Sequence, residues 1–207
     1  TQNLYSTFLG GSQPDQPHSM VVDANSDLII LGITGSANFP VTPTAFDTTF
    51  NGGPNVNVSF MPFAQGVDLF IAKLSSNGAS LLASTFIGGS GTDGANLAIV
   101  RNYGDQARGE VIASSAGEIL FASSSNSTDF PSGTNSYQDS LQGGQDAVLG
   151  RFNSNLSILN WSTYLGGTNN DAGFSLKLNS TENTVYAAGG TLSNNFPVST
   201  QAYKPVF

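Results

Sequence analysis

Cysteine is absent from the 207 residues, and only 10% of them are charged. Without cysteine the chain has no disulfide, no thiolate nucleophile and no cysteine-based metal site. The longest purely apolar runs, such as residues 28–31, are about four or five residues, whereas a membrane-spanning helix needs about 20. We therefore expect stability to come from packing alone and no insertion into a membrane.

Basic residues are also scarce. Six Lys and Arg stand against fourteen Asp and Glu, a formal net charge of -8, so a nucleic-acid phosphate backbone would be repelled. Hydrophobic residues make up 39% and aromatic residues 10%, which is enough to bury a core and is the opposite of a disordered composition. The 24 glycines, together with abundant Ser, Thr and Asn, disfavour long helices and favour short strands joined by tight turns.

The sequence repeats internally. A Ser-Thr-aromatic-aliphatic-Gly-Gly motif begins at Ser6, Ser84 and Ser162, so that both steps are 78 residues. An aspartate and a Phe-Pro pair follow each copy; the residues are Asp15, Asp93 and Asp171, then Phe39-Pro40, Phe130-Pro131 and Phe196-Pro197. A repeat of this length indicates stacked copies of one structural unit.

A third motif and two insertions complete the pattern. Asp68-Leu-Phe-Ile-Ala-Lys73-Leu74 reappears as Asp146-Ala-Val-Leu-Gly-Arg151-Phe152. The Phe-Pro pairs lie 91 and then 66 residues apart, because about residues 54–65 are inserted in the first unit and about residues 96–108 in the second. We expect both insertions in surface connections, where added length adds little closure entropy.

Each unit contains short apolar segments separated by turn residues, which predict antiparallel hairpins. They are residues 20–22, 28–31, 69–74 and 81–87, then 111–112, 119–121, 147–152 and 158–165, and finally 175–178 and 185–188. Several segments are apolar at every position, so both faces of each sheet should be covered.

Four-stranded antiparallel sheets that cover one another face to face are the blades of a β-propeller. The prediction is thus an all-β chain forming an incomplete arc of a larger propeller. Residues 1–11 would be the last strand of a preceding blade, 12–89 and 90–167 two blades, and 168–207 the first half of another. Tandem small sandwiches are the alternative, but they need about seven strands per unit.

The three motifs together resemble the bacterial SBBP repeat, the "seven-bladed β-propeller" family. The resemblance implies a large secreted or cell-surface bacterial protein, common in Bacteroidetes and exported by the type IX system. The partners that we expect are other domains of the same protein, a protein or glycan ligand, or the secretion machinery. The family has no general catalytic assignment. Residues 113–118 lack the acidic residue that Asp23 supplies at the first hairpin.

No residue stands out as catalytic, cofactor-binding or metal-ligating. His18, the only histidine, is expected in a solvated loop. Asp23, Asn25 and Asp27 alternate like the start of a calcium loop but lack its Gly and distal Glu, so an Asx-type turn is preferred. The repeated Asp15, Asp93 and Asp171 are expected to accept backbone N–H groups in their loops, although an arc of carboxylates could also bind Ca²⁺ or a sugar.

The remaining candidates are apolar. The Ser-Thr-aromatic stripe with Trp161 could form a carbohydrate platform, but its recurrence favours the core. Phe60, Met61 and Phe63 form an apolar tip that either contacts a partner or folds over its own sheet. The predicted function is a non-enzymatic extracellular scaffold or adhesion module without a cofactor; the alternative is a calcium- or carbohydrate-binding propeller, hydrolytic in one form.

Overall fold

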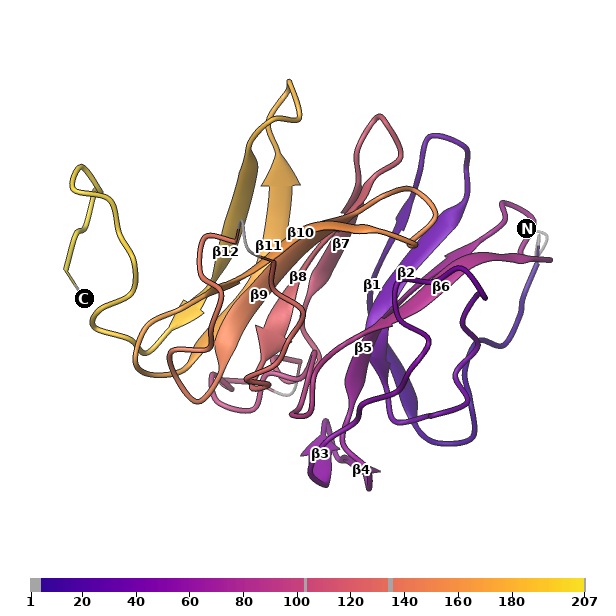
Figure 1. Cartoon of the computed structure of the whole chain (residues 1–207), viewed down its shortest axis with the longest axis horizontal. Coiled ribbons are helices and arrows are strands. Elements are labelled where there is room, and N and C mark those ends of the chain that lie inside the picture. The colour runs from indigo at the N-terminus through magenta and orange to yellow at the C-terminus, as the bar shows by residue number, and fades with distance from the viewer. Residues whose placement is uncertain (1–4, 103, 134–135, 207) are drawn as a thin grey trace.

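The computed structural model describes residues 5–102, 104–133 and 136–206. Residues 1–4 of the predicted 1–11 strand lie outside these ranges. The described part of the chain is all-β, with strands and connections and no helix (Figure 1). It therefore contains no helix that could cross a bilayer.

Two four-stranded antiparallel sheets form most of the molecule, as predicted. Sheet 1 contains, in spatial order, β1 (Asp15–Val22), β2 (Leu28–Thr34), β5 (Asp68–Leu74) and β6 (Leu81–Ile87). Sheet 2 contains β7 (Glu110–Ala113), β8 (Ile119–Ser125), β9 (Asp146–Phe152) and β10 (Leu159–Leu165) in the same order. A hairpin of β11 (Asp171–Leu178) and β12 (Val185–Thr191) follows, and β3 (Val56–Val58) pairs with β4 (Met61–Phe63) inside the first insertion.

The sheets are stacked beside one another, with their first strands adjacent: β1 contacts β7, and β7 contacts β11 (Figure 1). One apolar cluster joins sheets 1 and 2, because Leu31 and Ile71 of sheet 1 pack with Phe121 and Phe152 of sheet 2. All four side chains are fully buried. The apolar face of sheet 1 is thus shielded from solvent by sheet 2. Tandem sandwiches would have a separate core in each unit, so that alternative is wrong.

The other face of sheet 1 is covered differently from the prediction. Phe70 and Phe86 pack there against Phe39 from the connection between β2 and β5, with Val41 and Phe50 at the edge. The Phe39 and Phe70 ring centroids lie 4.3 Å apart. Among the described residues, a connecting segment covers this face.

The two ends of the chain carry less regular structure. Residues 5–11 form no strand and take part in no strand pairing, although Leu9 packs onto the outer face of sheet 1. At the other end, β11 packs on sheet 2 through Leu176, whereas most of β12 is exposed.

Candidate functional site

The repeated aspartates bind the loops that precede them. Asp93 Oδ2 accepts hydrogen bonds from Gly89 N at 2.8 Å and Ser127 Oγ at 2.7 Å, while Oδ1 accepts one from Ser125 Oγ. The Gly-Gly pair gives the backbone room to approach the carboxylate, because a Cβ on Gly88 would lie 3.0 Å from Asp93 Oδ2. Asp93 is fully buried.

The same contacts recur in the other two units. Asp15 accepts Gly11 N and Asp171 accepts Gly167 N, both at 2.7 Å. Ser193 Oγ donates to Asp171 as Ser127 does to Asp93. The prediction that these aspartates accept backbone N–H groups in their loops is confirmed.

A second loop contact comes from the residue before each Phe-Pro pair, a role that we did not predict. Asn38, Asp129 and Asn195 accept the backbone amides of Ser12, Ser90 and Thr168 at 2.8–2.9 Å. The same residues also accept the hydroxyl groups of these three side chains. The recurrence of Asn or Asp directly before Phe-Pro was the available sequence signal.

A further buried carboxylate begins the third strand of each full sheet: Asp68 in β5 and Asp146 in β9. Asp68 accepts Asn51 N at 2.7 Å and Gly52 N at 3.0 Å. Burial raises the pKa of Asp68 to about 8, although the hydrogen bonds from these amides act to lower it. The charge of the nearby Asp93 adds to the rise. Burial likewise raises the pKa of Asp93 to about 6. No cation contacts either group within the described residues.

Asp146 of β9 and Asp171 of β11 form the corresponding pair, and each has a carboxylate oxygen without a partner. Burial raises the pKa of Asp146, although its Oδ2 accepts Gln142 N at 2.9 Å. Asp146 Oδ1 and Asp171 Oδ1 are buried and have no hydrogen-bond partner. Across the residues that the structure describes, however, no three His, Asp or Glu side chains form a group that could hold a metal ion.

The first hairpin is an Asx-type turn, as predicted, held by an ion pair. Asp23 Oδ1 accepts Asn25 N at 2.9 Å and Asp27 N at 3.0 Å. Lys73 Nζ lies 2.7 Å from Asp23 Oδ2 and 3.5 Å from Asp27 Oδ2, so an ammonium group occupies the place that a calcium ion would need. Burial opposes ionisation of Asp23, but the bonds from Lys73 and the backbone outweigh it and lower its pKa.

The prediction for His18 is wrong. His18 lies in β1 at an irregularity in pairing between Pro17 and Ser19, and both ring nitrogens are buried without a hydrogen-bond partner. Burial lowers the pKa of the imidazole to about 4 and keeps it neutral. A single histidine among polar turn residues carried no sign that the strand extends back to Asp15.

The aromatic stripe belongs to the core in both full sheets. Phe86 and Tyr164 are fully buried, and the Tyr164 hydroxyl donates to Ser127 O at 2.7 Å. Trp161 is half-buried beside Leu120 and Leu149. Phe8, the equivalent residue in the first copy of the motif, is fully exposed.

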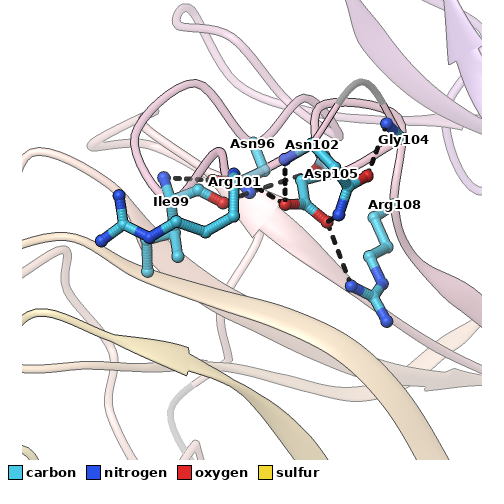
Figure 2. A network of polar contacts seen from close by, with 7 residues as sticks. All are labelled: Asn96, Ile99, Arg101, Asn102, Gly104, Asp105 and Arg108. Atoms are coloured by element: carbon cyan, nitrogen blue, oxygen red, sulfur yellow. Dashed lines mark hydrogen bonds and ion pairs between the residues drawn. The ribbon is translucent and has the colours of Figure 1, made fainter.

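The second insertion interrupts the first strand of sheet 2, where we had expected a connection between strands. Asp93 pairs with Ser125 as Asp15 pairs with Thr34, but β7 resumes only at Glu110. Between them, Asp105 accepts the backbone amides of Arg101 at 2.8 Å and Asn102 at 3.0 Å (Figure 2). These bonds order the insertion and, with the Arg101 amide contributing most, lower the pKa of Asp105.

The first insertion folds as a hairpin that contacts the second. Ser59 N donates to Gln106 Oε1 at 2.9 Å, which joins the two insertions. Phe63 is fully buried, which agrees with folding over its own sheet, whereas Phe60 is 93% exposed. Contact of this tip with a partner stays a prediction. A depression of about 300 Å³ lies between the two insertions and β1. Its lining consists of Gln16, Pro17, Ser59, Phe60, Gly104 and Ala107.

We call the exposed, non-repeated residues of both insertions the insertion face. It combines apolar side chains with two of the six basic residues and consists of Phe60, Met61, Leu97, Arg101 and Arg108. The Arg108 guanidinium lies 4.5 Å from the Phe174 ring centroid. It also forms an ion pair with Asp105 Oδ1 at 3.2 Å (Figure 2). Arg101 forms no ion pair with any described residue.

Comparison with known proteins found no family model that matches this chain and no curated protein similar to it.

Proposed function

We propose that the chain is a segment of a β-propeller that acts as a non-enzymatic scaffold or adhesion module in a secreted or surface protein of bacteria. The stacked four-stranded sheets and the motifs that resemble the SBBP repeat support this proposal. In this interpretation, the segment contacts other domains of the same protein and holds a protein or glycan ligand. Rigid sheets would keep the connecting loops at fixed positions.

The observation that carries the proposal is the repeated use of aspartate oxygens within the chain. Asp15, Asp93 and Asp171 each accept a glycine amide and a serine hydroxyl group at corresponding positions. A group that performs chemistry at one site would differ between units, whereas a loop-binding group is needed equally in each. These aspartates therefore support a structural role.

The insertion face is the part that differs between units, and we assign ligand contact to it. Surface carboxylates would repel an anionic partner, but Arg101 and Arg108 are exposed on the insertion that the Phe60 hairpin contacts through Ser59 and Gln106. Aromatic and arginine side chains are enriched where proteins bind partners. With ligand contact at the insertion face, the repeated loops have a purely structural role.

A second candidate is binding of calcium or a carbohydrate at the aspartate loops. One observation favours it: Asp146 Oδ1 and Asp171 Oδ1 are buried with no partner, and Gly166 lies against both carboxyl groups. Unpaired buried oxygens are destabilising unless a ligand or proton satisfies them. Calcium prefers such oxygen ligands.

Thermal melting with added calcium distinguishes the two candidates. We expect no saturable rise of the melting temperature in millimolar CaCl₂ beyond that seen in MgCl₂. Asp171→Asn should lower the melting temperature equally with and without calcium, because it weakens the loop contact itself. A rise that follows RT ln(1 + [L]/Kd), and that Asp171→Asn abolishes, would contradict the scaffold proposal and support the second candidate.

A further inference from the structure

One edge of β12 has no strand beside it in the part of the chain that the structure describes. Tyr186, Ala187 and Ala188 on this strand are exposed. A cavity of about 200 Å³ lies between this strand and sheet 2; its lining includes Leu149, Leu165, Ala172, Ala187, Gly189 and Phe196. An unpaired strand edge next to an apolar cavity is a template for another strand.

Sheet 1 shows what occupies the same place in a four-stranded sheet. There β5 pairs with β2, and Phe70 lies directly opposite Gly32. A Cβ on Gly32 would be 2.7 Å from the Phe70 ring, so the absence of a side chain makes room for it. Phe39 packs on the other side at 4.3 Å, and Phe70 is almost completely buried.

The third hairpin repeats the residues that hold Phe70. Asp171 pairs with Thr191 as Asp15 pairs with Thr34, which places Gly189 at the position of Gly32. Phe196 is the Phe-Pro phenylalanine equivalent to Phe39, and it lines the cavity. Whereas Phe39 is buried, Phe196 is half-exposed. The cavity therefore has the glycine and the phenylalanine of an aromatic pocket without the inserted ring.

Sheet 2 has a glycine–phenylalanine pair two positions further along its strands, while Ser123 and Val148 occupy the place of Gly32 and Phe70. Phe121 of β8 lies directly opposite Gly150 of β9, and a Cβ on Gly150 would be 2.5 Å from the Phe121 ring. Each full sheet thus combines one glycine with one phenylalanine across neighbouring strands. Because β12 supplies glycine, the strand that joins it should supply the aromatic residue.

We propose that β12 binds the first strand of an incoming β-hairpin of the β5–β6 type in antiparallel orientation. The strand begins with Asp opposite Thr191, places an aromatic third residue opposite Gly189 and a Lys or Arg at its sixth position opposite Tyr186, following the Thr34–Asp68, Gly32–Phe70 and Ile29–Lys73 pairs. The aromatic ring fills the cavity against Phe196. This inference rests on the repeat geometry and does not require an extracellular location or an adhesive role.

A second copy of β12 fits this edge less well. In an antiparallel pairing centred on Ala188, Gly189 would face Ala187 of the other copy, and neither residue fills the cavity. The β9–β10 hairpin is also a weaker match, because its third residue is Val148 and its small Gly150 would face Ala187. The aromatic residue is the feature that selects the partner.

The test measures hydrogen exchange of the full chain with a synthetic peptide of residues 66–89. We expect the amides of residues 185–191 to exchange more slowly, with saturation, when the peptide is added. Replacing Phe70 by Ala in the peptide should weaken binding at least about tenfold, because a large buried aromatic contributes more than the 1.4 kcal/mol that a factor of ten represents. A peptide of the same composition in scrambled order should give no protection.

Variants of the chain provide the second measurement. Phe196→Ala should weaken the peptide by a similar factor, whereas Val198→Ala, at an exposed position outside the cavity lining, should leave affinity unchanged. Equal binding of the wild-type and Phe70→Ala peptides, or no protection by either, would overturn the proposal. Protection of residues 185–191 that rises with protein concentration alone would show instead that a second copy covers the edge.

Discussion

Buried carboxylates at the strand ends have two opposing effects on the stability of the fold. Asp68 and Asp93 accept loop amides that would otherwise be unsatisfied, which stabilises the connections. Their burial also disfavours the charged form, and no described cation compensates. Each therefore binds a proton more tightly in the folded chain than in the unfolded chain.

This difference predicts that the protein loses stability as pH rises. The folded pKa of Asp68 is about 8, above its ordinary value of 3.8, so its contribution is fully present below the ordinary value and is lost as pH rises through about 8. Asp93, with a pKa of about 6, acts in the same direction at lower pH. The melting temperature should fall between about pH 4 and about pH 8, and Asp68→Asn should flatten that fall.

Asp139→Asn is the matched control, because Asp139 is exposed. It should leave the pH dependence as in the wild type. Parallel melting curves for the wild type and Asp68→Asn across the whole range would contradict the assignment of the pH dependence to this buried group.

At the scale of elements, the β3–β4 hairpin has two consecutive turn residues with positive φ, and neither is glycine. Its two turn residues, Ser59 and Phe60, have φ of 50° and 70°, a backbone that favours Asn-Gly or Gly-Gly. The β5–β6 turn places Gly78, with φ 68°, at such a position, whereas the β1–β2, β9–β10 and β11–β12 turns have one non-glycine residue each with positive φ: Ser26, Leu156 and Glu182. An exposed phenylalanine in this backbone is unfavourable for folding, which is consistent with a contact role for the insertion face.

Phe60→Gly should therefore stabilise the protein. A non-glycine residue in the left-handed region costs about 1 kcal/mol, and little apolar burial is lost because Phe60 is 93% exposed. Chemical denaturation should show a gain of roughly 0.5–1 kcal/mol for Phe60→Gly. Phe60→Ala keeps the strained backbone and should show almost no change. A loss of stability in Phe60→Gly would mean that the ring packs on the protein and is not available to a partner.

On the scale of the whole molecule, the core belongs to pairs of sheets. Leu31 of sheet 1 and Phe121 of sheet 2 are members of the same buried cluster. A polar contact also joins sheets 1 and 2, because Val111 N of β7 donates to Ser19 Oγ of β1 at 3.3 Å. Neither sheet has a complete apolar core of its own, so the two should unfold together.

Leu31→Ala tests this cooperativity. Removing a buried leucine should lower the free energy of unfolding by about 2–5 kcal/mol. Hydrogen exchange should then show the same loss of protection in β5 of sheet 1 and in β9 of sheet 2. Leu82→Ala, at a 46% exposed position of β6, should have a small effect. Loss of protection confined to sheet 1 would show that the sheets are independent units.

Local chemistry made most of the fold predictable. All ten apolar segments identified in the sequence lie within or at the ends of strands. Short apolar runs favour strands and the turn residues between them favour turns, and both preferences depend only on residues close together in the chain. The loop role of Asp93 was also predictable, since a residue that recurs with each Gly-Gly has the same backbone to satisfy. The His18 prediction failed because a strand irregularity depends on the partner strand β2 and leaves no local pattern.

The sequence by itself determined the all-β class, the repeated unit and the stacking of apolar faces, since each depends on residue types at short, regular spacing. Only the tertiary structure decided that the two insertions meet through Ser59 and Gln106, and that Gly189 and Phe196 line one cavity. Those residues are far apart in the chain, and their proximity depends on how whole sheets pack, which no local spacing encodes.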